Sequence, residues 1–185
     1  MASETAVLSR WIPWTTRATE IDWDALYAEQ LPRVYNFFRY RVGEAADAED
    51  LTSATFEKAW RSRNRYRGDP ARFAAWLFAI ARHLAIDHYR SARPLVPLEA
   101  AEAVAGTSDP EREAAQRSDH ERLIELLTQV PDRERELIAL KYGAGLTNRA
   151  IARVTGLGES NVGTILHRTI ADLRVRWDRK ETHRG

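Results

Sequence analysis

A short polar segment near residue 64 alternates arginines with an amide and an aromatic side chain. Four of the seven residues from Arg61 to Arg67 are arginines (Arg61, Arg63, Arg65 and Arg67), and Asn64 and Tyr66 lie between them. Guanidinium groups bind phosphates, and an aromatic ring beside an amide can hold an unstacked base, each stack contributing about 1–3 kcal/mol. The pattern favours contact with single-stranded DNA over a solvated loop without a ligand.

The helix predicted to follow, over residues 70–91, continues this chemistry. Arg82, His83 and Arg90 add further donors for phosphate. Trp76 instead lies on the apolar stripe of the helix, so core packing is favoured for it over base stacking. Loop and helix together predict one nucleic-acid surface.

Residues 146–173 have the spacing of a helix-turn-helix. This motif needs a small residue where the helices touch, a glycine in the turn and aliphatic residues on the second helix, as supplied here by Ala152, Gly156, Val162 and Ile165. A helical hairpin within a scaffold can share the spacing, but the basic tail that follows favours DNA. The side chains suited to base edges and phosphates are Arg149, Ser160, Asn161, Thr164, His167 and Arg168.

The elements that must position these residues are predicted to be helices throughout. Helical periodicity covers residues 23–41, 47–63 and 70–91, with Asp69 as the cap of the third helix and Pro70 in its first turn. After residue 120, one helix ends at Pro131, and Asp132 is expected to cap another that reaches Tyr142. No segment of useful length has the period of a strand, so the fold class is all-α.

The distribution of charge divides the chain. The formal net charge is only +1, yet residues 61–93 carry 8 basic and 2 acidic groups and residues 141–185 carry 9 and 4. Residues 94–121, which contain prolines and little apolar periodicity, carry 2 basic and 7 acidic groups. Two basic surfaces joined by an acidic, flexible linker are predicted, as two small helical domains; the alternative is that the charge blocks are ordinary solvated helix faces.

Composition excludes several classes of protein. The 185-residue chain has no Cys, which rules out disulfides, thiolate zinc sites and cysteine nucleophiles. No apolar run approaches the roughly 20 residues that a membrane span needs, and Trp11, Pro13 and Trp14 interrupt any signal-peptide core. No metal, cofactor or catalytic site is predicted, no membrane insertion is expected, and the expected location is the cytoplasm.

Several motifs strongly resemble region 2 of extracytoplasmic-function (ECF, group IV) sigma factors of the sigma-70 family. They are DLTSATFEKAW at 50–60, YRGD at 66–69, FAAWLFAIAR at 73–82 and DHYR at 87–90, and residues 123–177 look like region 4. The resemblance implies region 2 (23–93) and region 4 (120–178) joined by an acidic linker (94–119). Residues 1–22 are then an N-terminal extension and residues 179–185 a basic tail.

The resemblance also implies partners and roles. Region 2 would bind the β′ clamp helices of core RNA polymerase and the melted −10 element, and region 4 the β flap and the −35 duplex. A regulating anti-sigma factor is expected as well. The implied polymerase contacts are Asp50, Leu51, Phe56 and Trp60; the implied −10 contacts are Arg61, Arg63, Asn64, Arg65, Tyr66, Arg67, Arg82, His83 and Arg90; the −35 contacts are the helix-turn-helix residues named above.

Two features depart from the family pattern. Gly163 and Ile165 stand where many members carry Lys or Arg, which removes two potential DNA contacts. The extension with Trp11, Trp14 and Trp23 has no clear counterpart, and it is expected to pack on region 2, to bind a regulator or to be disordered.

The predicted function is promoter recognition, −10 melting and transcription initiation by a sigma factor that is not itself an enzyme. The alternative is a two-domain helix-turn-helix regulator that binds duplex DNA without polymerase. It would need a ligand or receiver domain, and residues 23–91 show no such α/β pattern. A helical hydrolase is disfavoured because the sequence has no HExxH and no close cluster of His and carboxylates.

Overall fold

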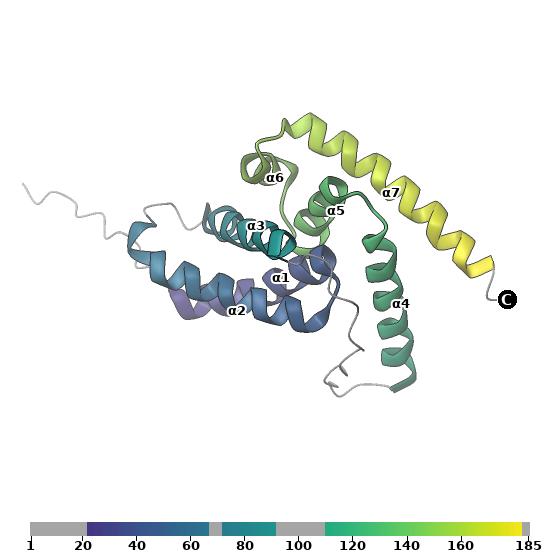
Figure 1. Cartoon of the computed structure of the whole chain (residues 1–185), viewed down its shortest axis with the longest axis horizontal. Helices are drawn as coiled ribbons and strands as arrows, with labels where there is room; N and C mark the ends of the chain where they lie inside the picture. Colours follow the sequence, from purple (N-terminus) through teal and green to yellow (C-terminus); the bar gives the residue numbers. More distant parts are fainter. Residues whose placement is uncertain (1–21, 67–71, 92–109, 183–185) are drawn as a thin grey trace, which may run out of the picture.

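The computed structural model describes residues 22–66, 72–91 and 110–182 (Figure 1). Every regular element in these ranges is helical, which confirms the all-α prediction. Among the described helices, none combines the length and apolar character needed to cross a membrane.

The N-terminal half packs three helices around aromatic residues. These are α1 (Trp23–Val42), α2 (Ala45–Ser62) and α3 (Phe73–Ser91), with the single turn η1 (Arg63–Arg65) after α2. The side-chain oxygen of Asp22 accepts a hydrogen bond from the Ala25 amide and caps α1. Phe37 and Phe78 are fully buried between the helices, with their ring centroids 5.8 Å apart.

The C-terminal half has four helices and one π-helical turn. They are α4 (Pro110–Thr128), α5 (Asp132–Ile138), the π turn η3 (Ala139–Gly143), α6 (Asn148–Thr155) and α7 (Glu159–Thr182). Gly156, between α6 and α7, has φ of 77°, a left-handed conformation that glycine adopts without strain. The helix-turn-helix prediction is therefore correct in its two helices and in the glycine of its turn.

Some local predictions differ from the structure. α4 begins at Pro110, inside the residues expected to form the linker. The prediction that Asp132 caps a helix is wrong: Pro131 holds the capping position and Asp132 is the first helical residue of α5. Its carboxylate is engaged by Arg41 of α1 instead. The Asp69 cap, Pro70, the linker residues 92–109 and residues 1–21 and 183–185 lie outside the described residues.

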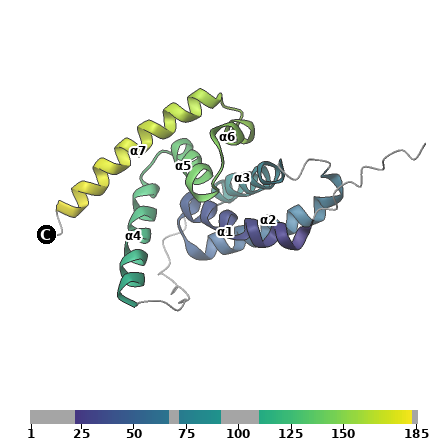
Figure 2. The ribbon, with the colours of Figure 1, turned by 180° about the vertical axis from the view of Figure 1, so that it is seen from behind.

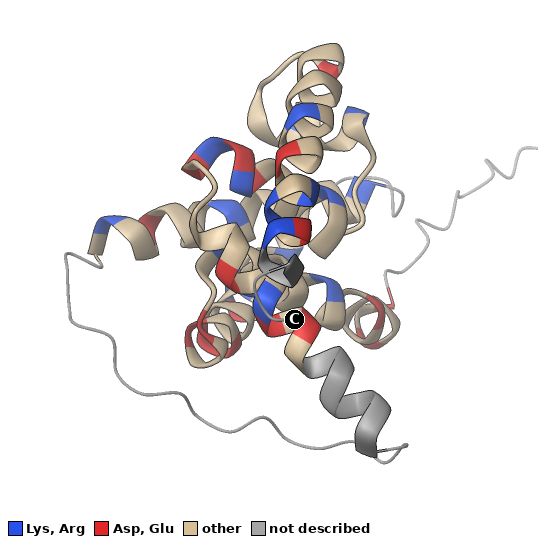
Figure 3. Cartoon of the chain, turned by 90° about the vertical axis from the view of Figure 1, so that its right-hand side faces the viewer, with Lys and Arg blue, Asp and Glu red and all other residues tan. Residues whose placement is uncertain are grey.

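The two halves are packed together rather than held apart. α1 lies against η3 and α3 against α6, and a single hydrophobic core runs through both halves, from Val34 to Leu173. The two opposite views agree on this arrangement (Figures 1 and 2), with α7 extending away from the N-terminal helices. Lys and Arg positions (blue) and Asp and Glu positions (red) are both distributed over the helices (Figure 3).

Candidate nucleic-acid interface

The end of α2 and the turn η1 present the predicted arginine segment. Arg61 is exposed and forms an ion pair of 2.6 Å with Glu57. The Arg63 guanidinium lies 3.9 Å from the centre of the Trp60 ring and donates to the Trp60 carbonyl oxygen at 2.8 Å. Asn64 is exposed. The Arg65 side chain and the whole of Arg67 lie outside the described residues.

Tyr66 is already part of an aromatic stack. Its ring centroid lies 4.8 Å from that of Trp76 and 5.7 Å from that of Phe73, and Phe73 is buried. Trp76 is half-buried, so it serves both the core, as expected, and this stack. We call Tyr66, Phe73 and Trp76 the aromatic platform; a base that reaches it would stack against rings that are already fixed in position.

One face of α3 continues from the platform. At 100° per residue, side chains seven positions apart lie almost above one another, so Trp76, His83 and Arg90 share a face. His83 is exposed, with Nδ1 2.6 Å from the Ala79 carbonyl oxygen, and the exposed Arg90 lies 3.9 Å from Asp87. Two of the three predicted contacts on α3 therefore line up with the platform.

Arg82, the third predicted contact on α3, does not lie on the face shared by Trp76, His83 and Arg90. It projects toward the C-terminal half, where its Nε lies 2.9 Å from Oε1 of Glu136 in α5. The side chains of Arg82 and Glu136 are only 25% and 11% exposed, so the pair is largely shielded from water. The sequence alone does not predict a role for Glu136, because no local pattern relates it to Arg82, which lies 54 positions earlier in the chain.

A second arginine pairs with the same helix. Nη1 and Nη2 of Arg41 donate to the two carboxylate oxygens of Asp132 at 2.5 and 2.9 Å, and the Arg41 side chain is 2% exposed. The guanidinium lies 4.5 Å from the centre of the Tyr89 ring, and the Tyr89 hydroxyl donates to the Arg41 carbonyl oxygen. Hydrogen bonds from Arg41 hold the pKa of Asp132 below 3.8, while burial raises the pKa of Tyr89.

The spacing of apolar residues in the sequence does indicate that Arg41 is buried. Val34, Phe38 and Arg41 follow the i, i+4, i+7 spacing of one helix face, and the first two are fully buried. A charged residue in the register of an apolar stripe indicates a buried ion pair.

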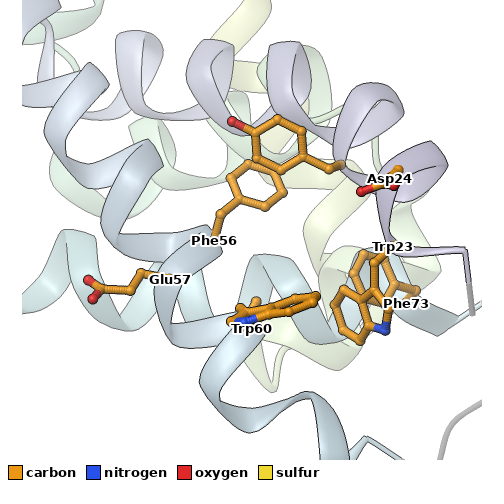
Figure 4. A pocket seen from close by; sticks show the side chains of 8 residues that line it. Trp23, Asp24, Phe56, Glu57, Trp60 and Phe73 are labelled. Carbon is orange, nitrogen blue, oxygen red and sulfur yellow. The ribbon is translucent and has the colours of Figure 1, made fainter.

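An apolar pocket of about 310 Å³ lies between the start of α1 and the end of α2 (Figure 4). Trp60 and Tyr27 on its rim are 51% and 48% exposed, and the Phe56 ring contacts that of Tyr27 at a tilt of 59°, with centroids 4.6 Å apart. Trp23, whose role the sequence left open, completes one wall and meets Trp60 edge to face at 5.8 Å. We call this the α1–α2 pocket.

The four predicted polymerase contacts do not form one cluster. Phe56 and Trp60 both line the α1–α2 pocket. Asp50 is exposed about 120° around α2 from Phe56, and Leu51 is half-buried against the core. Phe56 and Trp60 therefore offer an apolar surface, with Asp50 at its side.

Five of the six predicted −35 contacts occupy one exposed face at the start of α7, and the sixth, Arg149, lies on α6. Val162 and Leu166 on the opposite face are buried against the domain core and hold the helix in place. At Gly163 an added Cβ would lie 3.5 Å from the Asn148 side chain, an ordinary contact. Arg149 projects from α6 and pairs with Glu159 at 3.3 Å. The exposed residues of α7 are Ser160, Asn161, Thr164, His167 and Arg168.

No group of three or more His, Asp or Glu side chains within the described ranges is arranged to hold a metal ion.

Comparisons with known proteins match both halves. The family model for sigma-70 region 2 matches residues 26–94, and the model for sigma-70 region 4 matches residues 120–173. The ECF RNA polymerase sigma factor SigL of Mycobacterium tuberculosis is 32% identical over 160 residues, which cover 82% of this chain and 86% of SigL. The ECF sigma factor BldN of Streptomyces coelicolor is 31% identical over 151 residues, 80% of this chain but 57% of BldN.

A solved structure is also similar to this chain. CnrH, determined in complex with the cytosolic domain of CnrY, is 26% identical with a TM-score of 0.57. The likeness covers 83% of this chain and 84% of CnrH.

Proposed function

The chain belongs to the ECF RNA polymerase sigma factors, and we propose that it directs promoter recognition and −10 melting as a group IV member of the sigma-70 family. The observation that carries this proposal is the pairing of two different DNA surfaces in one chain. One is a helix-turn-helix face without aromatic residues, and the other is an aromatic platform beside arginines. A conventional duplex-binding regulator needs the first surface but not the second.

The start of α7 fits the major groove of the −35 duplex. Its exposed serine, asparagine, threonine, histidine and arginine side chains supply donors and acceptors for base edges and phosphates. Without a lysine or arginine at the positions of Gly163 and Ile165, this face has fewer cationic contacts than many family members. Sequence preference at −35 then depends more on the neutral polar side chains of this face, such as Asn161.

The aromatic platform and the η1 turn fit the melted −10 strand. A base that leaves the DNA stack loses a few kcal/mol and regains about 1–3 kcal/mol by stacking on an aromatic ring. Tyr66 supplies that ring, and the exposed Asn64 beside it supplies hydrogen bonds to the base edge. Arg61, Arg63, His83 and Arg90 would follow the phosphates along the strand.

The α1–α2 pocket fits a helix of the polymerase clamp. Trp60 and Tyr27 leave about half of their surfaces in water in the free chain. Full burial of a large apolar side chain contributes about 1.5–3 kcal/mol, so covering the exposed half of each ring contributes about half of that. The pocket therefore suits the apolar face of a β′ clamp helix, and region 4 is expected to meet the β flap.

In this role the chain does no bond chemistry. Polymerase transfers the phosphoryl group, while the sigma factor lowers the free energy of opening by binding the melted strand more tightly than the duplex. We expect it to act in the cytoplasm and to be held by an anti-sigma factor. The CnrH complex with a cytosolic domain of CnrY supports such a partner.

The direct test is in vitro transcription with bacterial core polymerase on genomic DNA fragments, followed by mapping of transcript 5′ ends. We expect specific start sites that share sequence elements near −35 and −10 and that are absent with core polymerase alone. Asn64→Ala should reduce the transcripts without reducing polymerase binding. Absence of specific transcripts, together with tight duplex binding by the isolated chain, would favour the regulator instead.

A further inference from the structure

The packed arrangement of the two halves is too short to reach both promoter elements. About 25 base pairs separate −35 from −10, which at 3.4 Å per base pair is roughly 85 Å. In the structure α6, the first helix of the helix-turn-helix, contacts α3, which carries the −10 residues. A chain folded in this way can occupy one element but not both at once.

Building on the proposed function, we propose that this arrangement is an autoinhibited state in which Asp132 and Glu136 of α5 act as internal substitutes for DNA phosphate. Each carboxylate engages an arginine of region 2: Asp132 binds Arg41 and Glu136 binds Arg82. Arg82 belongs to the predicted −10 surface. In the closed state its charge is neutralised from within, and opening releases it to the melted strand.

The arginine of each ion pair is shielded from water, while the Asp132 carboxylate is 68% exposed, so loss of either carboxylate would leave a shielded guanidinium without its partner. Arg41 is 2% exposed and donates hydrogen bonds to both carboxylate oxygens of Asp132, and the Tyr89 ring covers its guanidinium. A guanidinium that is buried and paired at two points is held much more firmly than the exposed pairs typical of protein surfaces. The Arg82–Glu136 pair is similarly shielded.

A glycine completes the contact. Gly143, in η3, lies so close to α1 that an added Cβ would be 2.8 Å from the Asn36 carbonyl oxygen and 2.9 Å from the Phe37 Cα. Arg33 of α1 donates to the Ala144 carbonyl oxygen next to it at 2.8 Å. Gly143 does not have a positive φ, so its own turn accepts an alanine; only the contact with α1 requires glycine.

The closed state inhibits the single-strand surface but not the −35 surface. The predicted −35 residues of α7 remain exposed in the closed state, whereas Arg82 is engaged by Glu136. The closed chain is thus able to read duplex DNA through α7 but lacks part of its single-strand surface. Separation of the halves restores that surface and allows the two promoter elements to be spanned.

The test uses two ways of opening the full-length chain. Gly143→Ala inserts a methyl group between η3 and α1 without changing any charge, and Gly158→Ala, where an added Cβ meets nothing within 4 Å, is its control. Asp132→Asn with Glu136→Gln removes the carboxylates while keeping the side-chain shapes. Glu134→Gln on the same helix measures the effect of losing one carboxylate charge, which is half of the change in net charge of the double variant.

Binding is measured by fluorescence anisotropy with a labelled mixed-sequence DNA single strand of about 12 nucleotides. If about a tenth of the free chain is open and tight binding needs the released Arg82, both opening variants should bind up to about tenfold more tightly than the original chain. Their radius of gyration in X-ray scattering should rise, and the controls should change neither quantity. Circular dichroism confirms that helical content is kept.

Unchanged affinity and dimensions in a folded opening variant would overturn the proposal. If Gly143→Ala loses helical content, the proposal is tested by the Asp132→Asn, Glu136→Gln double variant alone, compared with Glu134→Gln. Failure here is distinct from failure of the proposed function, because the original chain with core polymerase would still give specific start sites. Conversely, tighter single-strand binding without any transcription would keep the autoinhibition and reject the sigma role.

Discussion

Arg41 of α1 and Asp132 of α5 form a two-point ion pair although they are 91 residues apart in the chain. The arginine is buried, and the carboxylate stands at the rim of the contact with 68% of its side chain exposed. The pair thus ties the first helix of region 2 to a helix of region 4. It explains why the start of α5 carries an aspartate that caps nothing.

Asp132→Ala should weaken the contact between the halves more than it weakens either half. The substitution leaves a buried guanidinium without its partner, which costs about 1–3 kcal/mol unless the halves separate and water reaches Arg41. We therefore expect denaturant unfolding to split into two steps, with separation of the halves first. A single transition with an unchanged midpoint would contradict this reading of the ion pair.

Acidification should loosen the contact between α1 and α4 through His120. Its ring lies 5.9 Å from that of Tyr40, and burial, with Arg39 nearby, holds the pKa of His120 below 6.5. Because the folded pKa is lowered, the stabilisation is complete above pH 6.5 and is lost as the pH falls through the folded pKa. The free energy of unfolding should fall more between pH 7 and pH 5 in the original chain than in His120→Gln; equal slopes would remove His120 from the account.

Trp60→Ala should weaken binding to core polymerase about tenfold, because it removes apolar surface that the complex would cover. Trp60 is half-exposed in the free chain, so the loss of stability should be small. Lys58→Ala, exposed on another side of α2, is the matched control. Biolayer interferometry with immobilised polymerase measures both, and equal affinities for the two variants would reject the α1–α2 pocket as the docking surface.

Tyr66→Ala should reduce promoter opening about tenfold while polymerase binding is kept, since one base stack is worth about 1–3 kcal/mol. Asn64→Ala should also reduce opening, because it removes hydrogen bonds to the base edge. Tyr66→Phe retains the ring and should lose little. Asn64 is exposed, so its substitution tests the site without disturbing the core. Permanganate footprinting reports opening and co-purification reports binding; a parallel loss of both would contradict the assignment to −10.

Arg168→Ala should lower the salt dependence of −35 duplex binding. Each phosphate contact contributes about −0.9 to the slope of log K against log salt concentration. Loss of one contact should therefore reduce the magnitude of the slope by about 0.9. Arg174→Ala, exposed further along α7, should leave the slope unchanged. If Arg168→Ala instead changed the preferred base and kept the slope, Arg168 would contact a base rather than a phosphate.

The helices and the helix-turn-helix could be predicted because they depend on local spacing. The apolar period placed α1, α2 and α3 correctly, and the small residue, glycine and aliphatic positions around Gly156 fixed the turn. The side chains of the α7 face are exposed, as that spacing requires. Their contacts with −35 DNA, like the domain boundaries, remain predictions.

The contacts between the halves could not be predicted in this way. Arg82 has the residue type and the sequence position expected of a DNA contact, and only the fold brings Glu136 next to it. Asp132 has the sequence position of a cap, yet a buried guanidinium competes for its carboxylate more strongly than a helix amide does. A flexible linker predicted from composition likewise says nothing about whether the domains attract each other.

The central claim, that one chain carries two promoter-reading surfaces that polymerase spreads apart, can be tested by a single distance. Because the sequence has no cysteine, Asp87→Cys in α3 and Arg153→Cys in α6, both exposed, create the only two labelling sites. Energy transfer between dyes at these sites should be high in the free chain, where α3 and α6 are in contact. It should be lost in the complex with core polymerase and promoter DNA, where the surfaces stand roughly 85 Å apart. High transfer in an active complex would contradict the account.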